Sequence, residues 1–259
     1  MNCLTGDSQE LRIVLLGVCG AGKSPIGNII LGRETFKESR TRKSEIQRGS
    51  VKDRNISIID TPGFFNTKLT DEELQNEMIK SLYLAYPCPH VFLLIINLES
   101  FRDDERKLLE QIQENFGAQA LNFTLVLFTG REKISNKEWM DLKFSSKFQE
   151  LMSQCRDKYH VINSKRAIDP TQITELLEKI DELIKQNNHQ HYDNDSSLKS
   201  YLVKTRKKKK NHEKVKDYRK NAQEKEIKKE QLKITETCKM QVVKEKSTTN
   251  VVNEKFYYS

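Results

Sequence analysis

The chain has 259 residues, of which 32% are charged and 36% hydrophobic, and its formal net charge is +8. This length suits one α/β domain of about 200 residues with an appendage. Its longest aliphatic or aromatic run, VFLLII, is far shorter than the ~20 residues of a membrane-spanning helix, and its five cysteines are scattered without a CxxC pair, which excludes a transmembrane span, a disulfide framework and a cysteine-based zinc site. Because MNCLTGDSQE also lacks a basic and then apolar leader, we expect a cytoplasmic protein in a reducing compartment.

Short apolar runs alternate with amphipathic stretches over the first two thirds of the chain. This alternation is typical of crossover units, in which a mostly parallel sheet is covered by helices on both faces. We therefore predict an α/β fold with three layers, αβα, and a central sheet of about six strands. The runs that predict strands are LRIVLL (11–16), ISIID (56–60), VFLLIIN (91–97), FTLVLFT (123–129) and YHVIN (159–163).

The first predicted strand leads directly into GVCGAGKS, which matches the phosphate-binding pattern G-x-x-x-x-G-K-S/T and is followed by a helix-like stretch. Glycines let the backbone curl so that its N–H groups point at phosphate oxygens, and the start of the next helix adds its positive end. Lys23 would reach the β- and γ-phosphates, and the Ser24 hydroxyl would bind Mg²⁺. We predict a P-loop NTPase-type fold, with nucleotide-binding residues Gly17, Gly20, Ala21, Gly22, Lys23, Ser24 and Pro25.

The polar segment FKESRTRKSEIQRGSV (36–51) is the expected position of a loop that closes on the γ-phosphate and the metal. Thr41 is the predicted metal ligand and catalytic residue of this loop. A threonine in a solvated loop is the alternative interpretation.

A second motif, ISIIDTPG, ends a predicted strand at Asp60, 36 residues after Ser24. An acid at the carboxyl end of a strand beside a phosphate loop can hold Mg²⁺, usually through water, and the Gly63 N–H can reach a γ-phosphate. Alone, D-T-P-G is an ordinary turn. Together with the phosphate loop it favours a GTPase over a kinase or a general ATPase, with Lys23, Thr41 and Gly63 as the predicted catalytic residues and Ser24, Thr41 and Asp60 as the predicted metal ligands.

Two of the helical stretches carry start signals. Thr70 and Glu73 form the pattern of a capping box before a helix over 71–86. Asp169 and Pro170 suit the N-cap and first position of a second helix. Its predicted apolar face consists of Ile173, Leu176, Leu177, Ile180 and Ile184.

The composition changes near residue 188, where NNHQHYDNDSS resembles a polar linker. We predict a nucleotide-binding domain over 10–190 and a basic extension, helical or disordered, over 191–259. Residues 201–259 hold 18 Lys and Arg against 8 Asp and Glu, a net of +10, so the remaining 200 residues carry −2. The sparse apolar positions do not sustain a heptad repeat, which favours a solvated helix, although a coiled coil stays open.

The basic run KTRKKKK (204–210) has three interpretations. It could contact an anionic membrane surface, bind nucleic acid through phosphate neutralisation, or lie on a solvated helix. The absence of an apolar helix face makes any membrane contact peripheral and salt-sensitive, and nucleic acid is the less expected partner.

Several strings in order resemble the GIMAP family, the septin-related GTPases of immunity-associated proteins. They are GAGKSPIGNIILG, IIDTPGFF, CPHVFLLIINLESFRDDER, IQENFGAQALNFTLVLFTGREKI and CRDKYHVIN, and the likeness covers about residues 10–190. The resemblance implies binding of GTP and GDP with Mg²⁺, GTP-dependent dimerisation or further self-association through the nucleotide face, and a cytoplasmic or organelle-surface location.

The family motifs carry over to this sequence with departures. The guanine-recognition motif is here TGRE, which places Thr129 and Glu132 at the base, and VIN supplies Asn163. Gly130 removes an aliphatic stem that would cover the base. A buried carboxylate facing guanine discriminates against adenine, which offers no matching pair of donors.

The residues at the positions that serve hydrolysis depart further from the pattern of related GTPases. Phe64 and Phe65 stand where efficient small GTPases have a water-orienting glutamine, and Ser100 stands where hydrolysing relatives have an arginine, with Arg102 two residues on. Intrinsic hydrolysis should therefore be slow. Three functions stay open: a GTP-dependent switch or assembly scaffold, a GTPase activated by dimerisation, and, least expected, a nucleic-acid binder with a vestigial nucleotide pocket.

Overall fold

The computed structural model describes residues 10–37, 42–101, 105–163 and 170–192. The chain divides into two compact units, 1–201 and 202–259, and all the described residues belong to the first. Of the predicted basic extension, 191–259, only residues 191 and 192 are among the described residues.

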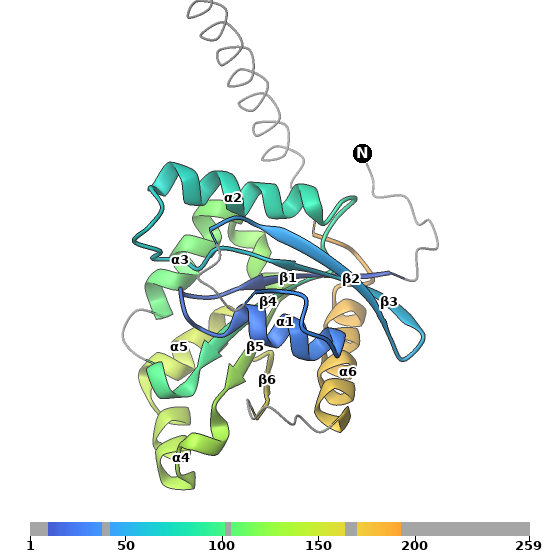
Figure 1. Cartoon of the computed structure of the whole chain (residues 1–259). Coiled ribbons are helices and arrows are strands. Elements are labelled where there is room, and N and C mark those ends of the chain that lie inside the picture. The colour runs from blue at the N-terminus through green and yellow to red at the C-terminus, as the bar shows by residue number, and fades with distance from the viewer. Residues whose placement is uncertain (1–9, 38–41, 102–104, 164–169, 193–259) are drawn as a thin grey trace, which may run out of the picture. The chain divides into compact units, whose positions relative to one another are not determined.

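A mixed sheet forms the centre of the first unit, with strand order β2-β3-β1-β4-β5-β6 (Figure 1). β2 runs antiparallel to β3, and the other neighbouring pairs are parallel. The mostly parallel sheet of six strands that the sequence predicts is thereby confirmed. The strands are β1 (Leu11–Leu16), β2 (Glu45–Val51), β3 (Arg54–Asp60), β4 (Val91–Asn97), β5 (Thr124–Thr129) and β6 (Tyr159–Val161).

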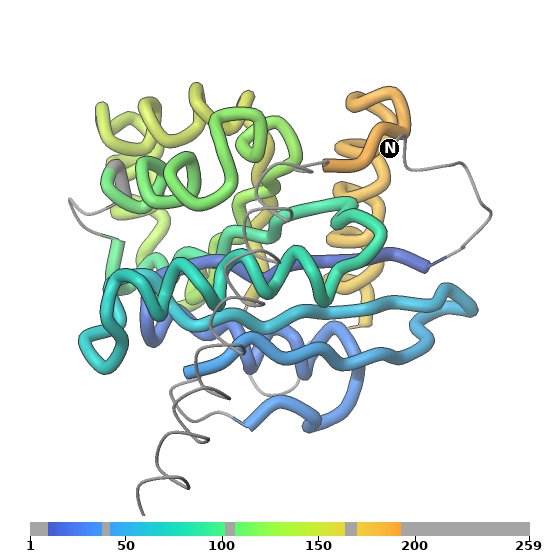
Figure 2. Tube along the Cα trace, turned by 90° about the horizontal axis from the view of Figure 1, so that it is seen from above, coloured from blue at the N-terminus to red at the C-terminus, as the bar shows by residue number. Residues whose placement is uncertain are grey.

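The edge strand β2 differs from expectation, because residues 45–51 were predicted to belong to a polar loop. β2 pairs with β3 along its whole length, from Glu45 opposite Asp60 to Val51 opposite Arg54. The two turn residues, Lys52 and Asp53, both have positive φ, 50° and 60°, as the tightest type of hairpin turn requires. Figure 2 shows this hairpin as two light-blue segments joined at one tip. The strand escaped prediction because it is polar and no residue of its turn is a glycine.

Helices cover both faces of the sheet and give the predicted three layers. One core cluster joins Val14 and Leu16 of β1 to residues of α2, α3 and α5. The other joins Ile13 and Leu15 to α1 and α6. Since neighbouring strand residues point to opposite faces, the two sets of helices lie on opposite sides. The helices are α1 (Lys23–Leu31), α2 (Asp71–Leu84), α3 (Glu105–Phe116), α4 (Asn136–Lys143), α5 (Ser146–Gln154) and α6 (Pro170–Gln186).

The local helix signals act as predicted. The Thr70 side chain accepts from the Glu73 N–H at 3.2 Å, and the Glu73 carboxylate accepts from the Thr70 N–H at 2.9 Å, which completes the capping box of α2. α6 begins at Pro170, while its predicted cap, Asp169, lies outside the described residues. All five residues of its predicted apolar face are buried, together with Leu183.

The composition excluded a disulfide framework and a membrane-spanning helix, and the structure can be compared with both predictions. Cys19 and Cys155 are free, whereas Cys88 is disulfide-bonded, so the scattered spacing of the cysteines did not exclude a single bridge. Among the described helices, none has the length and the apolar character needed to cross a bilayer.

Tyr192 closes the packed part of the chain from within the stretch that was predicted to be a polar linker. Its side chain is 1% exposed and packs edge-on against Phe92 and Phe123. Its hydroxyl donates to the Phe116 carbonyl, and its N–H donates to the Pro89 carbonyl at 3.2 Å. The domain core therefore extends to residue 192.

We expect Tyr192→Ala to lower the free energy of unfolding by about 3 kcal/mol, because it leaves a cavity among aromatic rings and removes a buried hydrogen bond. Urea unfolding of the full chain followed by circular dichroism measures this. Tyr83→Ala is the matched control, since Tyr83 is 55% exposed and its removal should change stability by about 0.5 kcal/mol or less. Equal effects of the two substitutions would show that Tyr192 is not part of the core.

Candidate nucleotide-binding site

The predicted phosphate loop joins the carboxyl end of β1 to the first turn of α1 (Figure 1). Gly17, Gly20 and Gly22 have φ of 150°, 89° and 93°, in the region that favours glycine. A Cβ on Gly17 would also lie 2.6 Å from the Ile95 carbonyl oxygen of β4. The glycines therefore let the loop curl tightly between two central strands, with the N-terminus of α1 at the same edge.

Lys23 opens α1 and folds back over this loop. Its side chain is buried, and its Nζ donates to the Val18 carbonyl at 3.0 Å and reaches the Gly17 carbonyl at 3.5 Å. Burial lowers the pKa of Lys23, and the nearby Asp60 carboxylate opposes that shift. The ammonium is thus held among loop carbonyls, in a place where a polyanion would stabilise its charge.

Ser24 and Asp60 bring two oxygen donors together beside Lys23. The Ser24 hydroxyl donates to Asp60 Oδ2 at 2.6 Å, and Asp60 is fully buried at the end of β3. Glu45 lies opposite Asp60 on β2, and its pKa is raised by burial and by the Asp60 charge. A hydroxyl and a carboxylate at hydrogen-bond distance are hard oxygen ligands of the kind that Mg²⁺ takes, so these residues fit the predicted metal.

The loop after β3 is attached to the phosphate loop by the backbone. The Phe64 N–H donates to the Gly17 carbonyl and the Cys19 N–H to the Phe64 carbonyl, both at 3.0 Å. Between these bonds, a Cβ on Gly63 would lie 2.3 Å from the backbone of Cys19, so only glycine fits there. Thr61 adds a further link, since its hydroxyl donates to the Leu15 carbonyl at 2.7 Å. The structure thus brings Gly63 to the phosphate loop.

The two phenylalanines of this loop have different environments. Phe64 is fully buried in the core cluster on the α2 side of the sheet. Phe65 is 45% exposed and has a φ of 57°. Neither offers a polar atom for orienting a water molecule, as the sequence already indicated.

The predicted base-binding residues follow β5 and β6, at the same edge of the sheet as the phosphate loop. Thr129 is buried as the last residue of β5. Glu132 is half-buried in the short 3-10 helix Arg131–Lys133. Asn163 is exposed just after β6, and its N–H donates to Gln172 Oε1 at 2.8 Å.

Asn97, the last residue of β4, belongs to this region although sequence analysis did not select it. A Cβ on Gly130 would lie 2.8 Å from Asn97 Oδ1, and Gly130 also has a φ of 76°. The Lys133 ammonium contacts the Glu99 carboxylate at 2.6 Å and so links the loop after β5 to the loop after β4. The available signal was the polar residue that ends VFLLIIN, because strand ends at this edge border the site.

Several predicted residues cannot be placed. Thr41, the proposed metal ligand of the closing loop, and Arg102 both lie outside the described residues. Ser100 is exposed after β4, and its hydroxyl donates to the Asn97 carbonyl at 3.3 Å. Of the predicted phosphate and metal residues, the structure therefore joins Lys23, Ser24, Asp60 and Gly63 and leaves Thr41 as a prediction.

The chain is similar in sequence to proteins described as GTPases or nucleotide-binding proteins. GTPase IMAP family member 8 of Homo sapiens is 32% identical over 188 residues, which cover 69% of this chain and 28% of that protein. Immune-associated nucleotide-binding protein 13 of Arabidopsis thaliana is 30% identical over 203 residues, which cover 71% of this chain and 58% of that protein. The chain thus spans well under two thirds of the length of these two relatives.

A solved structure, Toc33 from Arabidopsis thaliana in complex with GDP and Mg²⁺, shares the fold with a TM-score of 0.58 at 18% identity, over 72% of this chain and 89% of that one. A dimerization-deficient mutant of Toc33 gives the same TM-score at 16% identity, over 71% and 88% of the two chains. The sequence model of the AIG1 family matches residues 11–216, well over half of the chain. The chain therefore belongs to the AIG1 family, which confirms its resemblance to the GIMAP GTPases.

Proposed function

We propose that this protein binds GTP and GDP with Mg²⁺ and acts as a nucleotide-dependent switch or assembly scaffold with slow intrinsic hydrolysis. The observation that carries the proposal is the meeting of Lys23, the Ser24–Asp60 pair and Gly63 around one glycine loop. Relatives named GTPase and nucleotide-binding protein, and the GDP and Mg²⁺ bound to Toc33, support it.

The phosphates would lie against the amides of the loop and the N-terminus of α1. Lys23 would exchange its bond with the Val18 carbonyl for phosphate oxygens, a favourable change for a buried ammonium. Ser24 would hold Mg²⁺ directly and Asp60 through water, with Thr41 as a further ligand when its loop closes. When bound, the ion neutralises charge on the β- and γ-phosphate oxygens.

The base would lie over the loop after β5. Glu132 would accept two hydrogen bonds from guanine, and Thr129 and Asn163 would border the ring. Gly130 has no aliphatic stem to cover the base, and Asn97 occupies the space that a side chain at this position would need. We therefore propose that Asn97 replaces the missing stem as one wall of the guanine site.

Slow hydrolysis follows from two positions. Phe64 is committed to the core and cannot turn toward a water molecule, and Ser100 cannot supply the positive charge of an arginine. The alternative is a GTPase activated by dimerisation. Dimerization is important for the GTPase activity of the chloroplast translocon components atToc33 and psToc159, whose solved structure shares the fold with a TM-score of 0.52. The exposed Phe65 gives this chain an apolar group next to the phosphate loop.

We also propose a cytoplasmic protein whose basic run 204–210 makes peripheral contact with an anionic organelle membrane. Opposite charge supports this, at about 1 kcal/mol per basic residue near such a surface.

We expect Lys23→Ala to weaken GDP and GTP binding by about 10- to 100-fold, because it removes a charge-assisted bond to phosphate from a buried position. Isothermal titration calorimetry with GDP, GTP and ATP, with and without Mg²⁺, measures this. Lys137→Ala, an exposed lysine of α4, is the control and should bind as the parent does.

In the same calorimetry, Asp60→Asn distinguishes the contribution of Mg²⁺ to nucleotide affinity from that of the phosphate contacts. It should retain Mg²⁺-free binding while losing most of the gain that Mg²⁺ provides. Unchanged affinity in Lys23→Ala, or tighter binding of ATP than of GTP in the parent, would contradict the proposal.

Single-turnover GTP cleavage across a range of protein concentrations decides between switch and dimer-activated enzyme. We expect bound GTP to persist at all concentrations. A rate that rises steeply with concentration would instead establish the dimer-activated GTPase. Ser100→Arg should then raise the dimer rate at least tenfold if an arginine at this position stabilises the transition state.

Sedimentation with vesicles tests the tail. The full chain should sediment with phosphatidylserine vesicles at low salt, and about 0.5 M salt should release it, because screening shortens the range of the attraction. Replacing the basic residues of 204–210 by glutamine should abolish sedimentation. RNA binding that persists in that variant would favour the nucleic-acid alternative.

A further inference from the structure

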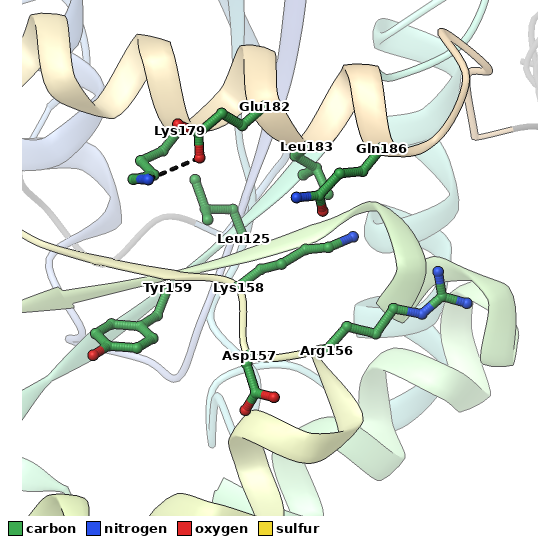
Figure 3. Close-up of a pocket in the computed structure, with 9 residues that line it drawn as sticks. All are labelled: Leu125, Arg156, Asp157, Lys158, Tyr159, Lys179, Glu182, Leu183 and Gln186. Carbon is green, nitrogen blue, oxygen red and sulfur yellow. Dashed lines mark hydrogen bonds and ion pairs between the residues drawn. The ribbon is translucent and has the colours of Figure 1, made fainter.

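A second pocket opens at the edge of the sheet opposite the phosphate loop. It has a volume of about 160 Å³ and lies between the start of β5 and β6 and the last turns of α6 (Figure 3). Its lining includes Leu125 and Leu183, which are only 2% and 1% exposed, and the basic residues Arg156, Lys158 and Lys179. Since ~10–15 Å³ suffices for one water molecule, the pocket has room for a small solute.

The turn between α5 and β6 sets the directions of the charged groups. Arg156 and Asp157 both have positive φ, 56° and 57°, and the Asp157 N–H donates to the Met152 carbonyl at 2.8 Å. In Figure 3 the side chains of Arg156 and Lys158 run in the same direction, toward the end of α6 that carries Gln186, whereas Asp157 points away. The acid of the turn therefore does not lie between the two cations.

The Lys158 ammonium makes a long hydrogen bond to a protein acceptor. Its Nζ lies 3.4 Å from the Asn122 carbonyl oxygen, longer than the ~2.8 Å of a good charge-assisted bond. The same carbonyl already accepts from Asn187 Nδ2 at 3.0 Å. Burial first, and then the charge of Arg156, lower the pKa of Lys158, with Cys155 opposing them.

Lys179 differs from Lys158 because it forms a close ion pair, with its ammonium 2.8 Å from the Glu182 carboxylate. The opposite charges of Lys179 and Glu182 therefore cancel on the α6 side of the pocket. The positive charge that remains is that of Arg156, which is exposed, and Lys158, which is half-buried, and the charge of Arg156 acts on Lys158. An anion between them would relieve their repulsion and use the planar fork of the arginine.

We propose that this pocket binds the phosphate group of a small soluble molecule between Lys158 and Arg156. The site is separate from the predicted nucleotide site, since it uses the opposite ends of the strands. It would bind its ligand whatever occupies the phosphate loop.

The test uses nuclear magnetic resonance of the full, ¹⁵N-labelled chain with excess GDP and Mg²⁺, so that added phosphate meets an occupied phosphate loop. Inorganic phosphate and glycerol 3-phosphate are titrated at constant ionic strength set with chloride. We expect saturable shifts of the amides of 156–159 and of the end of α6. Glycerol 3-phosphate should bind at the same place as inorganic phosphate, because the site recognises the phosphate group.

Three variants locate the binding. Lys158→Gln and Arg156→Gln should each weaken phosphate binding at least tenfold, while Lys137→Gln, the same change at an exposed site, should alter it less than twofold. Because Asn187 still donates to the Asn122 carbonyl, Lys158→Gln should leave the remaining amide spectrum unchanged. Arg156→Lys keeps the charge and serves if Arg156→Gln does not fold.

Three results would overturn the proposal: shifts that chloride reproduces, shifts confined to residues 17–24, or unchanged affinity in Lys158→Gln. Shifts at 156–159 seen only with phosphatidylinositol phosphate vesicles would assign the site to a lipid headgroup instead of a soluble molecule. A failure of GDP to bind would appear separately, as phosphate-induced shifts in the phosphate loop.

Discussion

The whole site depends on the pair of backbone hydrogen bonds that joins the phosphate loop to the loop after β3. Phe64 forms these bonds with Gly17 and Cys19, which makes an isolated parallel bridge between Val18 and Phe64 beyond the ends of β1 and β3. The contact is close enough that a side chain at Gly63 would collide with the neighbouring backbone. Two loops distant in sequence are thereby fixed in one geometry before any ligand arrives, which lowers the entropy that binding must overcome.

Charge in the site is arranged around this frame. Lys23 and Asp60 are both buried and close together, so each has lost hydration that the other only partly replaces. A bound phosphate would bring an anion to Lys23, and a bound divalent cation would lie beside Asp60. The carboxyl edge of the sheet thus holds a buried lysine and a buried carboxylate close together, with Phe64 packed in the core beside them.

The two edges of the sheet offer anions different chemistry. At the carboxyl edge, glycines bring backbone amides and one buried lysine to a ligand. At the amino edge, long side chains from the turn before β6 extend beside α6, and no glycine is needed. The first arrangement suits a nucleotide whose phosphates lie along a loop. The second suits a single phosphate group held by side chains.

The sequence by itself determined the features that are local: the buried strands, the glycine pattern before Lys23, the capping box at Thr70 and the apolar face of α6. Each depends on residues within a few positions of one another. Only the tertiary structure decided the features that need partners far along the chain. A polar stretch becomes β2 because β3 offers it an edge for pairing. Asn97 fills the space beside Gly130 that a side chain would need. Tyr192 is buried because aromatic residues from other elements surround it. Such contacts leave no periodicity in the sequence, since the distance between their partners along the chain is set by the fold.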